Sequence, residues 1–247
     1  MIGFEEIARN VSEVKSRIEK EAESHGRPAP ELLAATKMND AEHINFAARA
    51  CGVTLIGENR VQELLEKYPF LDPSIRIRFI GRLQRNKVKY VVDKVEMIES
   101  LDSLPLAYEI EKQASKKGLV MKVLLEVNTG REAQKGGFMP EELEDALREI
   151  SELPHVHVCG LMAVTPVCEK SEEKSRYFRE TYQKFIDISG KKLHNIDMNV
   201  LSMGMTDSYI EAIAEGSTEV RLGSAIFGRR GGAGDAEQKG AALPGDL

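Results

Sequence analysis

Eight short, mostly apolar segments alternate with helical patterns along this chain of 247 residues. Segments of this kind, separated by helices, are typical of parallel strands that are buried on both faces of a sheet. Eight such units favour a (β/α)₈ TIM barrel over an open doubly wound sheet, which would carry a glycine-rich turn after its first strand. The predicted strands cover residues 32–36, 54–57, 75–80, 97–100, 121–127, 156–163, 198–202 and 219–222.

An additional amphipathic helix is predicted before the first strand, because apolar residues recur there at helical spacing. They are Phe4, Ile7, Val11, Val14 and Ile18. Further helical patterns cover residues 41–50, 104–116, 140–150 and 177–188. No repeat or internal linker indicates a second domain. We therefore expect a single barrel domain over residues 1–230 and a disordered, glycine-rich tail over residues 231–247.

Charge and cysteine usage exclude several classes of function. The net charge of −6 argues against a nucleic-acid partner, because no excess positive charge is present to neutralise phosphates. We expect no membrane span and no signal peptide, and hence a cytoplasmic protein, because the chain has no long apolar stretch and its first 20 residues carry acids throughout. Cys51, Cys159 and Cys168 form no C-x-x-C pair, and the histidines lack metal-ligand spacing, so we predict no metal site.

A lysine stands at the carboxyl end of the first predicted strand. Lys37 follows the apolar run 32–36 and precedes a helical pattern. Binding and catalytic groups of a TIM barrel collect at the carboxyl ends of its strands, so we expect Lys37 to face the barrel mouth, opposite the loops of the last two strands. A lysine partly withdrawn from water gives up its proton more easily, and Schiff-base formation with an aldehyde needs the neutral amine. The alternative is a charged residue on the surface or the rim.

Glycines and small polar residues follow the last two predicted strands. Ser202 and Gly204 lie at the end of the seventh strand, and Gly223 and Ser224 follow the eighth. Barrels often bind phosphate at these two loops, where glycine lets backbone N–H groups approach and serine adds a donor. Each segment alone also suits a tight turn, but two of them at these places predict a phosphate site. We expect Thr206 to begin the next helix as its cap.

An arginine in the eighth predicted strand completes the pattern. If a pyridine ring spans from Lys37 to the phosphate site, Arg221 could face the ring nitrogen. Arginine keeps its proton, so Arg221 would donate to an unprotonated pyridine nitrogen; the alternative is an ion pair inside the barrel. A neutral pyridine is a poorer electron sink than a pyridinium paired with an aspartate. Lys37, Arg221 and the phosphate loops together predict a covalently held pyridoxal phosphate in a site that supports little carbanion chemistry.

Several long motifs follow one another in one order along the chain, at residues 33–37, 57–63, 79–87, 160–162, 201–205 and 216–228. Together they resemble the pyridoxal phosphate homeostasis protein family, which is related to the barrel domain of bacterial alanine racemases, the pyridoxal phosphate fold type III. The match extends from about Glu5 to Gly228. The resemblance supports the barrel and implies that pyridoxal phosphate is the cofactor.

The resemblance also implies roles for individual residues. Lys37 forms the Schiff base, Arg221 faces the pyridine nitrogen, and the phosphate is held by Ser202, Gly223 and Ser224. Asn59 is expected to lie near the ring; the alternative is that its side chain caps a helix. The function implied is binding of pyridoxal phosphate for vitamin B6 homeostasis with little or no catalysis. Apo-enzymes that need the cofactor are the expected partners, and we expect a monomer.

The chain departs from the family at a few positions. Arg82 replaces a usual histidine, Arg85 replaces a usual serine, and Thr36 and Thr206 stand where serine is common. The usual tyrosine after Gly228 is also lacking. Arg82 adds a charge either near the cofactor mouth or at the surface.

Three other functions are compatible with a lysine-bearing barrel. An amino-acid racemase needs acid–base groups on both faces of the substrate carbon. In alanine racemases the second base depends on a C-terminal β-domain, and this chain stops soon after the eighth predicted strand, so we expect no racemase. A barrel aldolase that uses a lysine would be colourless as isolated. A purely structural protein would take up no chromophore.

Overall fold

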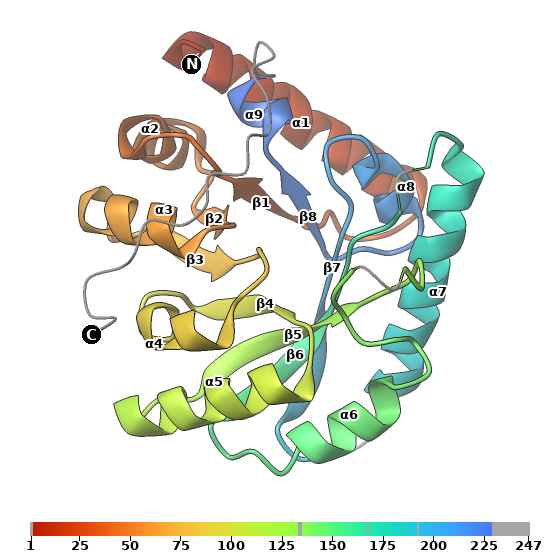
Figure 1. The fold of residues 1–247 in the computed structure, drawn as a ribbon. Helices are drawn as coiled ribbons and strands as arrows, with labels where there is room; N and C mark the ends of the chain where they lie inside the picture. The colour runs from red at the N-terminus through yellow and green to blue at the C-terminus, as the bar shows by residue number, and fades with distance from the viewer. Residues whose placement is uncertain (1, 133–134, 167, 192, 229–247) are drawn as a thin grey trace.

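Eight parallel strands close into a barrel in which each strand pairs with its neighbours in sequence and β8 pairs with β1 (Figure 1). This computed structural model describes residues 2–132, 135–166, 168–191 and 193–228. The predicted TIM barrel is confirmed, and the expected tail at 231–247 lies outside the described residues. The strands are β1 Glu31–Ala35, β2 Leu55–Glu58, β3 Arg76–Phe79, β4 Met97–Leu101, β5 Met121–Val127, β6 Val156–Ala163, β7 Ile196–Met203 and β8 Glu219–Leu222.

Helices surround the barrel and connect its strands (Figure 1). Their apolar faces pack on the sheet, and this packing explains why the strands are buried on both sides. The helices are α1 Phe4–Ser24, α2 Ala41–Cys51, α3 Val61–Lys67, α4 Val88–Val91, α5 Leu104–Lys117, α6 Leu143–Ile150, α7 Ser171–Ser189, α8 Tyr209–Ala214 and α9 Ser224–Phe227, with 3₁₀ turns η1 Tyr68–Phe70 and η2 Arg85–Lys87.

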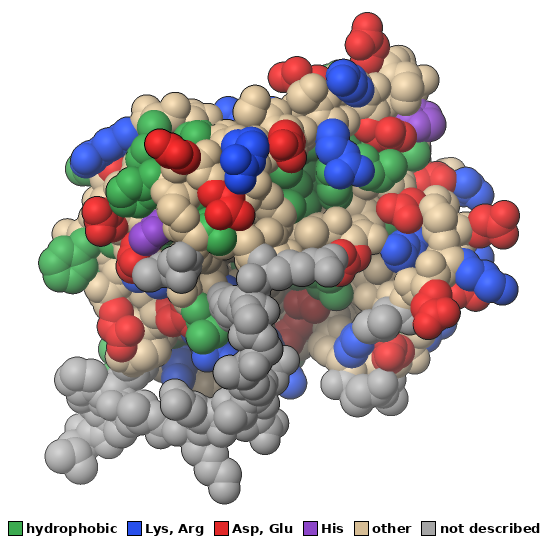
Figure 2. Space-filling view, turned by 90° about the horizontal axis from the view of Figure 1, so that it is seen from above, with side chains coloured by type: hydrophobic (Ala, Val, Ile, Leu, Met, Phe, Trp, Pro, Cys, Tyr) green, Lys and Arg blue, Asp and Glu red, His purple; other side chains and the backbone are tan. Residues whose placement is uncertain are grey.

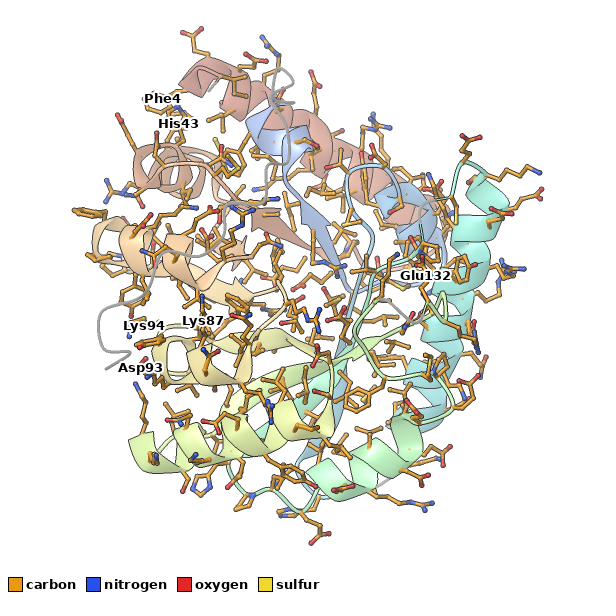
Figure 3. The ribbon with its side chains drawn as sticks, viewed as in Figure 1. Phe4, His43, Lys87, Asp93, Lys94 and Glu132 are labelled. Carbon is orange, nitrogen blue, oxygen red and sulfur yellow. The ribbon has the colours of Figure 1, made fainter. Side chains whose placement is uncertain are left out.

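The predicted N-terminal helix is confirmed as α1, which lies along the side of the barrel where β1 and β8 meet (Figure 1). It packs against α2, α8 and α9. At its start, the ring of Phe4 stacks on Phe46 of α2 at a centroid distance of 4.6 Å and lies 5.0 Å from the ring of His43 (Figure 3). Its buried face consists of Ile7, Val11, Val14, Ile18 and Ala22. Full burial of such an aliphatic side chain contributes about 1.5–3 kcal/mol, so α1 is a structural part of the barrel.

Two helix starts differ from the prediction. α7 begins at Ser171 and not at residue 177, because its first turn is marked by Glu172 and Glu173 and carries no apolar periodicity. Acidic residues in a first turn favour the helix through its dipole. α6 begins at Leu143 and not at the proline at position 140, which lies in the preceding turn.

One cysteine is buried inside the barrel. Cys159 of β6 packs with Met97, Leu124 and Met162. Burial raises the pKa of the Cys159 thiol, which keeps it in its unreactive, protonated form. Its role is therefore packing.

Candidate functional site

A pocket opens at the barrel mouth, beside the carboxyl ends of β1 and β8. It brings together five of the predicted residues: Lys37, Asn59, Arg221, Gly223 and Ser224. Residues from the loop after β7, among them Thr206, also line the pocket. Ser202 and Gly204 do not line it. We call this space the mouth pocket.

Lys37 and the loop after β8 are neighbours on the barrel, so the expectation that they face each other across the mouth is wrong. β1 pairs directly with β8, with Leu33 opposite Arg221 and Ala34 opposite Leu222. A Cβ atom added to Gly223 would lie 3.1 Å from the carbonyl oxygen of Ala35. The missing side chain therefore lets the end of β8 lie close against the end of β1. Closure of the barrel brings the first and last strands together, although they are far apart in the chain.

The chain turns sharply directly after Lys37. Met38 has a φ of 61°, in the left-handed region that residues other than glycine rarely adopt. The N–H of Asn39 donates to the carbonyl oxygen of Thr36 at 3.0 Å and closes the turn. α2 then begins behind Asp40, whose carboxylate accepts the N–H of His43 at 2.9 Å. The turn leaves the partly buried Lys37 side chain at the mouth pocket.

Two hydroxyls meet on the wall formed by the loops after β7 and β8. The hydroxyl of Ser224 donates to the hydroxyl of Thr206 at 3.3 Å, and both residues line the mouth pocket. α8 begins at Tyr209 behind Ser208, so the prediction that Thr206 caps the helix is wrong. Thr206 is a pocket residue that the sequence analysis missed. Its position two residues after Gly204 in a strand-end loop was the available signal.

Gly204 determines the path of the loop after β7, although it lies outside the pocket. Its φ is 94°, and an added Cβ would lie 2.6 Å from the Cβ of Ala212 and 2.9 Å from the Cα of Tyr209. The carbonyl of Gly204 also accepts the N–H of Arg221 at 3.0 Å. Only a glycine fits this sharp turn against α8. Gly204 thus brings Thr206 to the pocket without lining the pocket itself.

The side chain of Ser202 lies inside the barrel and not at the mouth pocket. Its hydroxyl is 2.7 Å from Glu99 Oε2, 2.7 Å from Glu219 Oε1 and 2.7 Å from Nη1 of Arg221. A hydroxyl has one proton and two lone pairs. It can accept from Arg221 and donate to one carboxylate, so the other carboxyl must carry a proton to complete the set. Ser202 therefore binds Arg221, and this geometry gives no support to a contact of its hydroxyl with a phosphate.

The two carboxyls below the pocket share a second arginine. Arg78 of β3 donates to Glu99 at 3.3 Å and to Glu219, and all three side chains are buried. Burial and the proximity of Glu99 raise the pKa of Glu219 well above its usual 4.5. This direction agrees with the proton count at Ser202. The lower part of the barrel interior is thus a charged network that contacts Arg221 through one hydroxyl.

Arg221 is held by two neutral acceptors. It donates to Ser202 through Nη1 and to the carbonyl oxygen of Ala163 through Nη2, the second bond at 2.8 Å. Burial raises the pKa of Glu126 and the charge of Arg221 opposes this larger effect, but no carboxylate of the described residues lies at ion-pair distance from the guanidinium, so the predicted alternative of an interior ion pair is wrong. These bonds use two of its five N–H groups. Arg221 is buried yet lines the mouth pocket, so it presents a fixed positive charge there.

A wider groove adjoins the mouth pocket and shares Met38, Asn39 and Asn59 with it. Asn59 is not a helix cap, because α3 begins behind Arg60. Arg82 lines the groove with 78% of its side chain exposed and its Nε 4.0 Å from Asp102 Oδ2. The departure at Arg82 thus adds a surface charge beside the mouth. Basic and acidic side chains are interspersed over the face drawn in Figure 2, with no broad patch of one sign.

The donors at the mouth pocket fit an anionic aldehyde. They comprise a primary amine, two hydroxyls, a guanidinium and backbone brought close by a glycine.

Within the described part of the chain, no group of three or more His, Cys, Asp or Glu side chains is placed to hold a metal ion. In the same part, no helix combines the length and apolar character needed to cross a membrane.

Comparison with known proteins gives a consistent family. The model of the alanine racemase N-terminal domain matches residues 4–231. The pyridoxal phosphate homeostasis protein of Aquifex aeolicus is 44% identical over 223 residues, which cover 89% of this chain and 96% of that protein. The protein of the same name from Escherichia coli K12 is 34% identical over 231 residues, covering 91% and 97%.

Solved structures share the fold. PipY of Synechococcus elongatus PCC7942, with pyridoxal phosphate bound, has a TM-score of 0.78 and 29% identity, covering 90% of this chain and 100% of that one. Alanine racemase from Corynebacterium glutamicum has a TM-score of 0.70 at 14% identity, covering 92% of this chain and 62% of the racemase, which shows a common fold alone.

Fold and pocket together define a barrel of the alanine racemase N-terminal type that carries a lysine at the end of its first strand. More narrowly, the chain belongs to the family of the pyridoxal phosphate homeostasis proteins. The predicted resemblance is confirmed.

Proposed function

We propose that this chain binds pyridoxal phosphate on Lys37 and serves in the homeostasis of that cofactor. The observation that carries the proposal is the meeting of Lys37, Arg221, Thr206 and Ser224 in one pocket at the barrel mouth. Relatives over most of the chain are named for this function, and PipY holds the cofactor in its structure. When bound, pyridoxal phosphate supplies an aldehyde that forms a covalent bond with an amine.

Each side of the pocket has a separate task in this proposal. Lys37 supplies the amine. The hydroxyls of Thr206 and Ser224 bind the phosphate, together with backbone that Gly204 and Gly223 allow to approach. Asn59, which also lines the pocket, contacts the ring.

Arg221 faces the ring nitrogen in the same proposal, and Ser202 orients Arg221. Because the guanidinium keeps its proton, it donates a hydrogen bond and leaves the ring nitrogen unprotonated. The bonds to Ser202 and Ala163 hold the guanidinium in place. An unprotonated ring withdraws electrons weakly, so the site binds and releases the cofactor with little or no catalysis.

The proposal extends to how the protein acts in the cell. We take apo-enzymes that require pyridoxal phosphate as the recipients, the cytoplasm as the location, and a monomer as the acting state. The exposed side chains of Met38 and Met205 lie at the mouth pocket, so a recipient would meet an open rim. Light scattering during size-exclusion chromatography checks the monomer, and activation of an added apo-enzyme by the loaded protein checks the transfer.

The central experiment is an absorbance spectrum followed by borohydride reduction and peptide mass spectrometry. We expect the protein incubated with pyridoxal phosphate to show a visible band that reduction bleaches, with the added mass on the peptide that contains Lys37. Lys37→Ala should lose both signals. Lys191→Ala, which removes a surface lysine paired with Glu144, is the matched control and should keep them. Absence of the band, or an adduct on another lysine, would contradict the proposal.

The same preparations separate the alternative functions. A lysine aldolase would be colourless and would not need the added cofactor to bind a sugar phosphate. For the racemase, single enantiomers of several amino acids are incubated with the loaded protein. Turnover at enzymatic rates that disappears in Lys37→Ala would contradict the proposed carrier function and show that the protein is an enzyme.

A further inference from the structure

Side chains of α3 hold both peptide groups that flank Lys37. Nζ of Lys67 donates to the carbonyl oxygen of Thr36 at 2.9 Å, and the N–H of Met38 donates to Glu63 Oε2 at 2.6 Å. Lys67 Nζ also donates to this same Glu63 oxygen at 3.1 Å, which links the two anchors. The Thr36 carbonyl precedes the Cα of Lys37 and the Met38 N–H follows it. The backbone is therefore held on both sides of the residue.

A buried carboxyl ties these anchors to β2. Lys67 Nζ donates to Glu58 Oε1 at 3.0 Å, and the hydroxyl of Thr36 donates to the same oxygen at 2.7 Å. Glu58 is fully buried, only 11% of the Lys67 side chain is exposed, and Glu58 Oε2 has no hydrogen-bond partner among the described residues. Removal of one member of a buried ion pair leaves an uncompensated charge. Lys67 is thus the cation on which this carboxyl depends.

The proton count of Lys67 explains why it is not the reactive amine. An ammonium has three N–H donors, and Lys67 has three acceptors within hydrogen-bond distance: the Thr36 carbonyl, Glu58 and Glu63. Lys67 lines the adjoining groove but not the mouth pocket, whereas Lys37 lines the mouth pocket.

The turn after Lys37 needs such support. The left-handed conformation of Met38 is disfavoured for a residue with a Cβ, and 55% of Met38 is exposed, so packing contributes little to holding it. The hydrogen bond from its N–H to Glu63 is a specific contact that stabilises the conformation. If the turn relaxed, the direction of the Lys37 side chain would change with it.

We propose that Lys67 is a positioning residue for Lys37: it fixes the Thr36 carbonyl directly and the Met38 N–H through Glu63, and thereby the direction in which the Lys37 amine enters the mouth pocket. The inference rests on the proposed function, because it concerns how that amine meets the cofactor. It assigns a role to a residue that does not line the mouth pocket.

The test compares Lys67→Met with Lys15→Met. Lys15 Nζ donates to the carbonyl oxygens of Cys51 and Gly52 at 2.8 and 3.3 Å, so its replacement also removes lysine–carbonyl bonds but leaves the turn at Lys37 intact. Titration of pyridoxal phosphate, followed by the visible band, gives the affinity. Hydrogen exchange at the Met38 amide of the cofactor-free protein reports on the turn, and thermal unfolding reports on stability.

We expect Lys67→Met to bind pyridoxal phosphate at least about tenfold more weakly than the wild type, because charge-assisted hydrogen bonds are lost. Its Met38 amide should exchange faster. Lys15→Met should match the wild type in both measurements, and Lys67→Arg, which restores a cation with several donors, should recover part of the affinity. If Lys67→Met does not fold, Glu63→Ala removes the Met38 anchor and one of the three acceptors of Lys67 at a partly exposed position, leaves the bonds of Lys67 to Thr36 and Glu58, and should weaken binding by a few-fold.

The outcomes separate this inference from the proposed function. A wild type without the visible band would overturn the proposed function itself. A wild type that binds, together with Lys67→Met or Glu63→Ala variants that bind equally well and protect the Met38 amide equally, would overturn only the positioning role. Equal losses in Lys67→Met and Lys15→Met would also overturn it, since general stability would then explain the effect.

Discussion

The mouth pocket is built in different ways in two neighbouring parts: the lysine end, at β1, and the proposed anion end, at the loops after β7 and β8. At the lysine end, charged side chains hold the backbone, and they come from β2 and α3, more than twenty residues further along the chain: Glu58, Glu63 and Lys67. At the anion end, two strand-end loops carry glycines, which allow close packing of the backbone, and hydroxyls, which face the pocket: Gly204, Thr206, Gly223 and Ser224. The difference follows from the groups to be held. In the proposed function the long, flexible amine of Lys37 has to be directed at an aldehyde, whereas a phosphate would be bound wherever donors can approach its oxygens closely.

The sharpest way to separate the two ends is a ligand that lacks the anion. For the double variant Thr206→Val and Ser224→Ala we expect the affinity for pyridoxal phosphate to fall roughly a hundredfold, because two hydrogen bonds to a charged group are lost. Binding of pyridoxal, which has the aldehyde but no phosphate, should be unchanged. Absorbance titrations with the two ligands measure both constants. Equal losses for both ligands would show that these hydroxyls do not serve the anion.

A smaller effect is expected when the turn behind the anion end is strained. Gly204→Ala places a Cβ at 2.6 Å from that of Ala212 in a backbone with φ of 94°, so we expect a loss of about 1–3 kcal/mol in the free energy of unfolding. Gly118→Ala is the matched control: its φ is 64°, but an added Cβ meets nothing within 4 Å. Urea unfolding of both variants separates backbone strain from the clash. Equal losses would show that the contact with α8 is unimportant.

The smallest predicted effect concerns the buried charged network inside the barrel, in which Glu99 and Glu219 contact Ser202. Burial and Glu99 raise the pKa of Glu219, so the folded state binds more protons than the unfolded state above pH about 4.5. This contribution to stability is therefore present at low pH and is lost as the pH rises towards the folded-state pKa. Glu219→Gln keeps a neutral side chain at every pH. Its stability relative to the wild type should rise with pH, by at most about 1.4 kcal/mol per unit.

Urea unfolding at a series of pH values checks this slope. Glu144→Gln is a control of opposite sign, because its hydrogen bond with Lys191 lowers the pKa of Glu144, and the wild type gains from the ionised form as the pH rises. The Glu144 variant should therefore fall behind the wild type with increasing pH. A flat difference for Glu219→Gln would mean that the carboxyl pair shares no proton in the folded protein.

Much of the fold, and several of the residues that line the mouth pocket, could be predicted from the sequence, because both depend on local patterns. Alternating apolar strands and amphipathic helices predict the barrel, and glycines and serines at two strand ends predict the phosphate loops. The lysine end was only partly accessible. Lys37 stands out at its strand end, but nothing in the sequence links it to Lys67, since the bond between Lys67 and the Thr36 carbonyl forms only when the end of α3 lies near the end of β1. Ser202 was assigned to the phosphate because its strand-end position does not reveal which way the side chain points.

By itself, the sequence determined that eight buried parallel strands would form and that an amine, an arginine and two glycine-bearing loops would stand at strand ends, because hydrophobic periodicity and backbone freedom are local properties of the chain. Only the tertiary structure decided that β1 lies beside β8, that Ser202 points inward to Arg221, and that Lys67 holds the turn at Lys37. Barrel closure and the pairing of buried charges join residues far apart in the chain. Such contacts are settled by packing and desolvation, which no local pattern records.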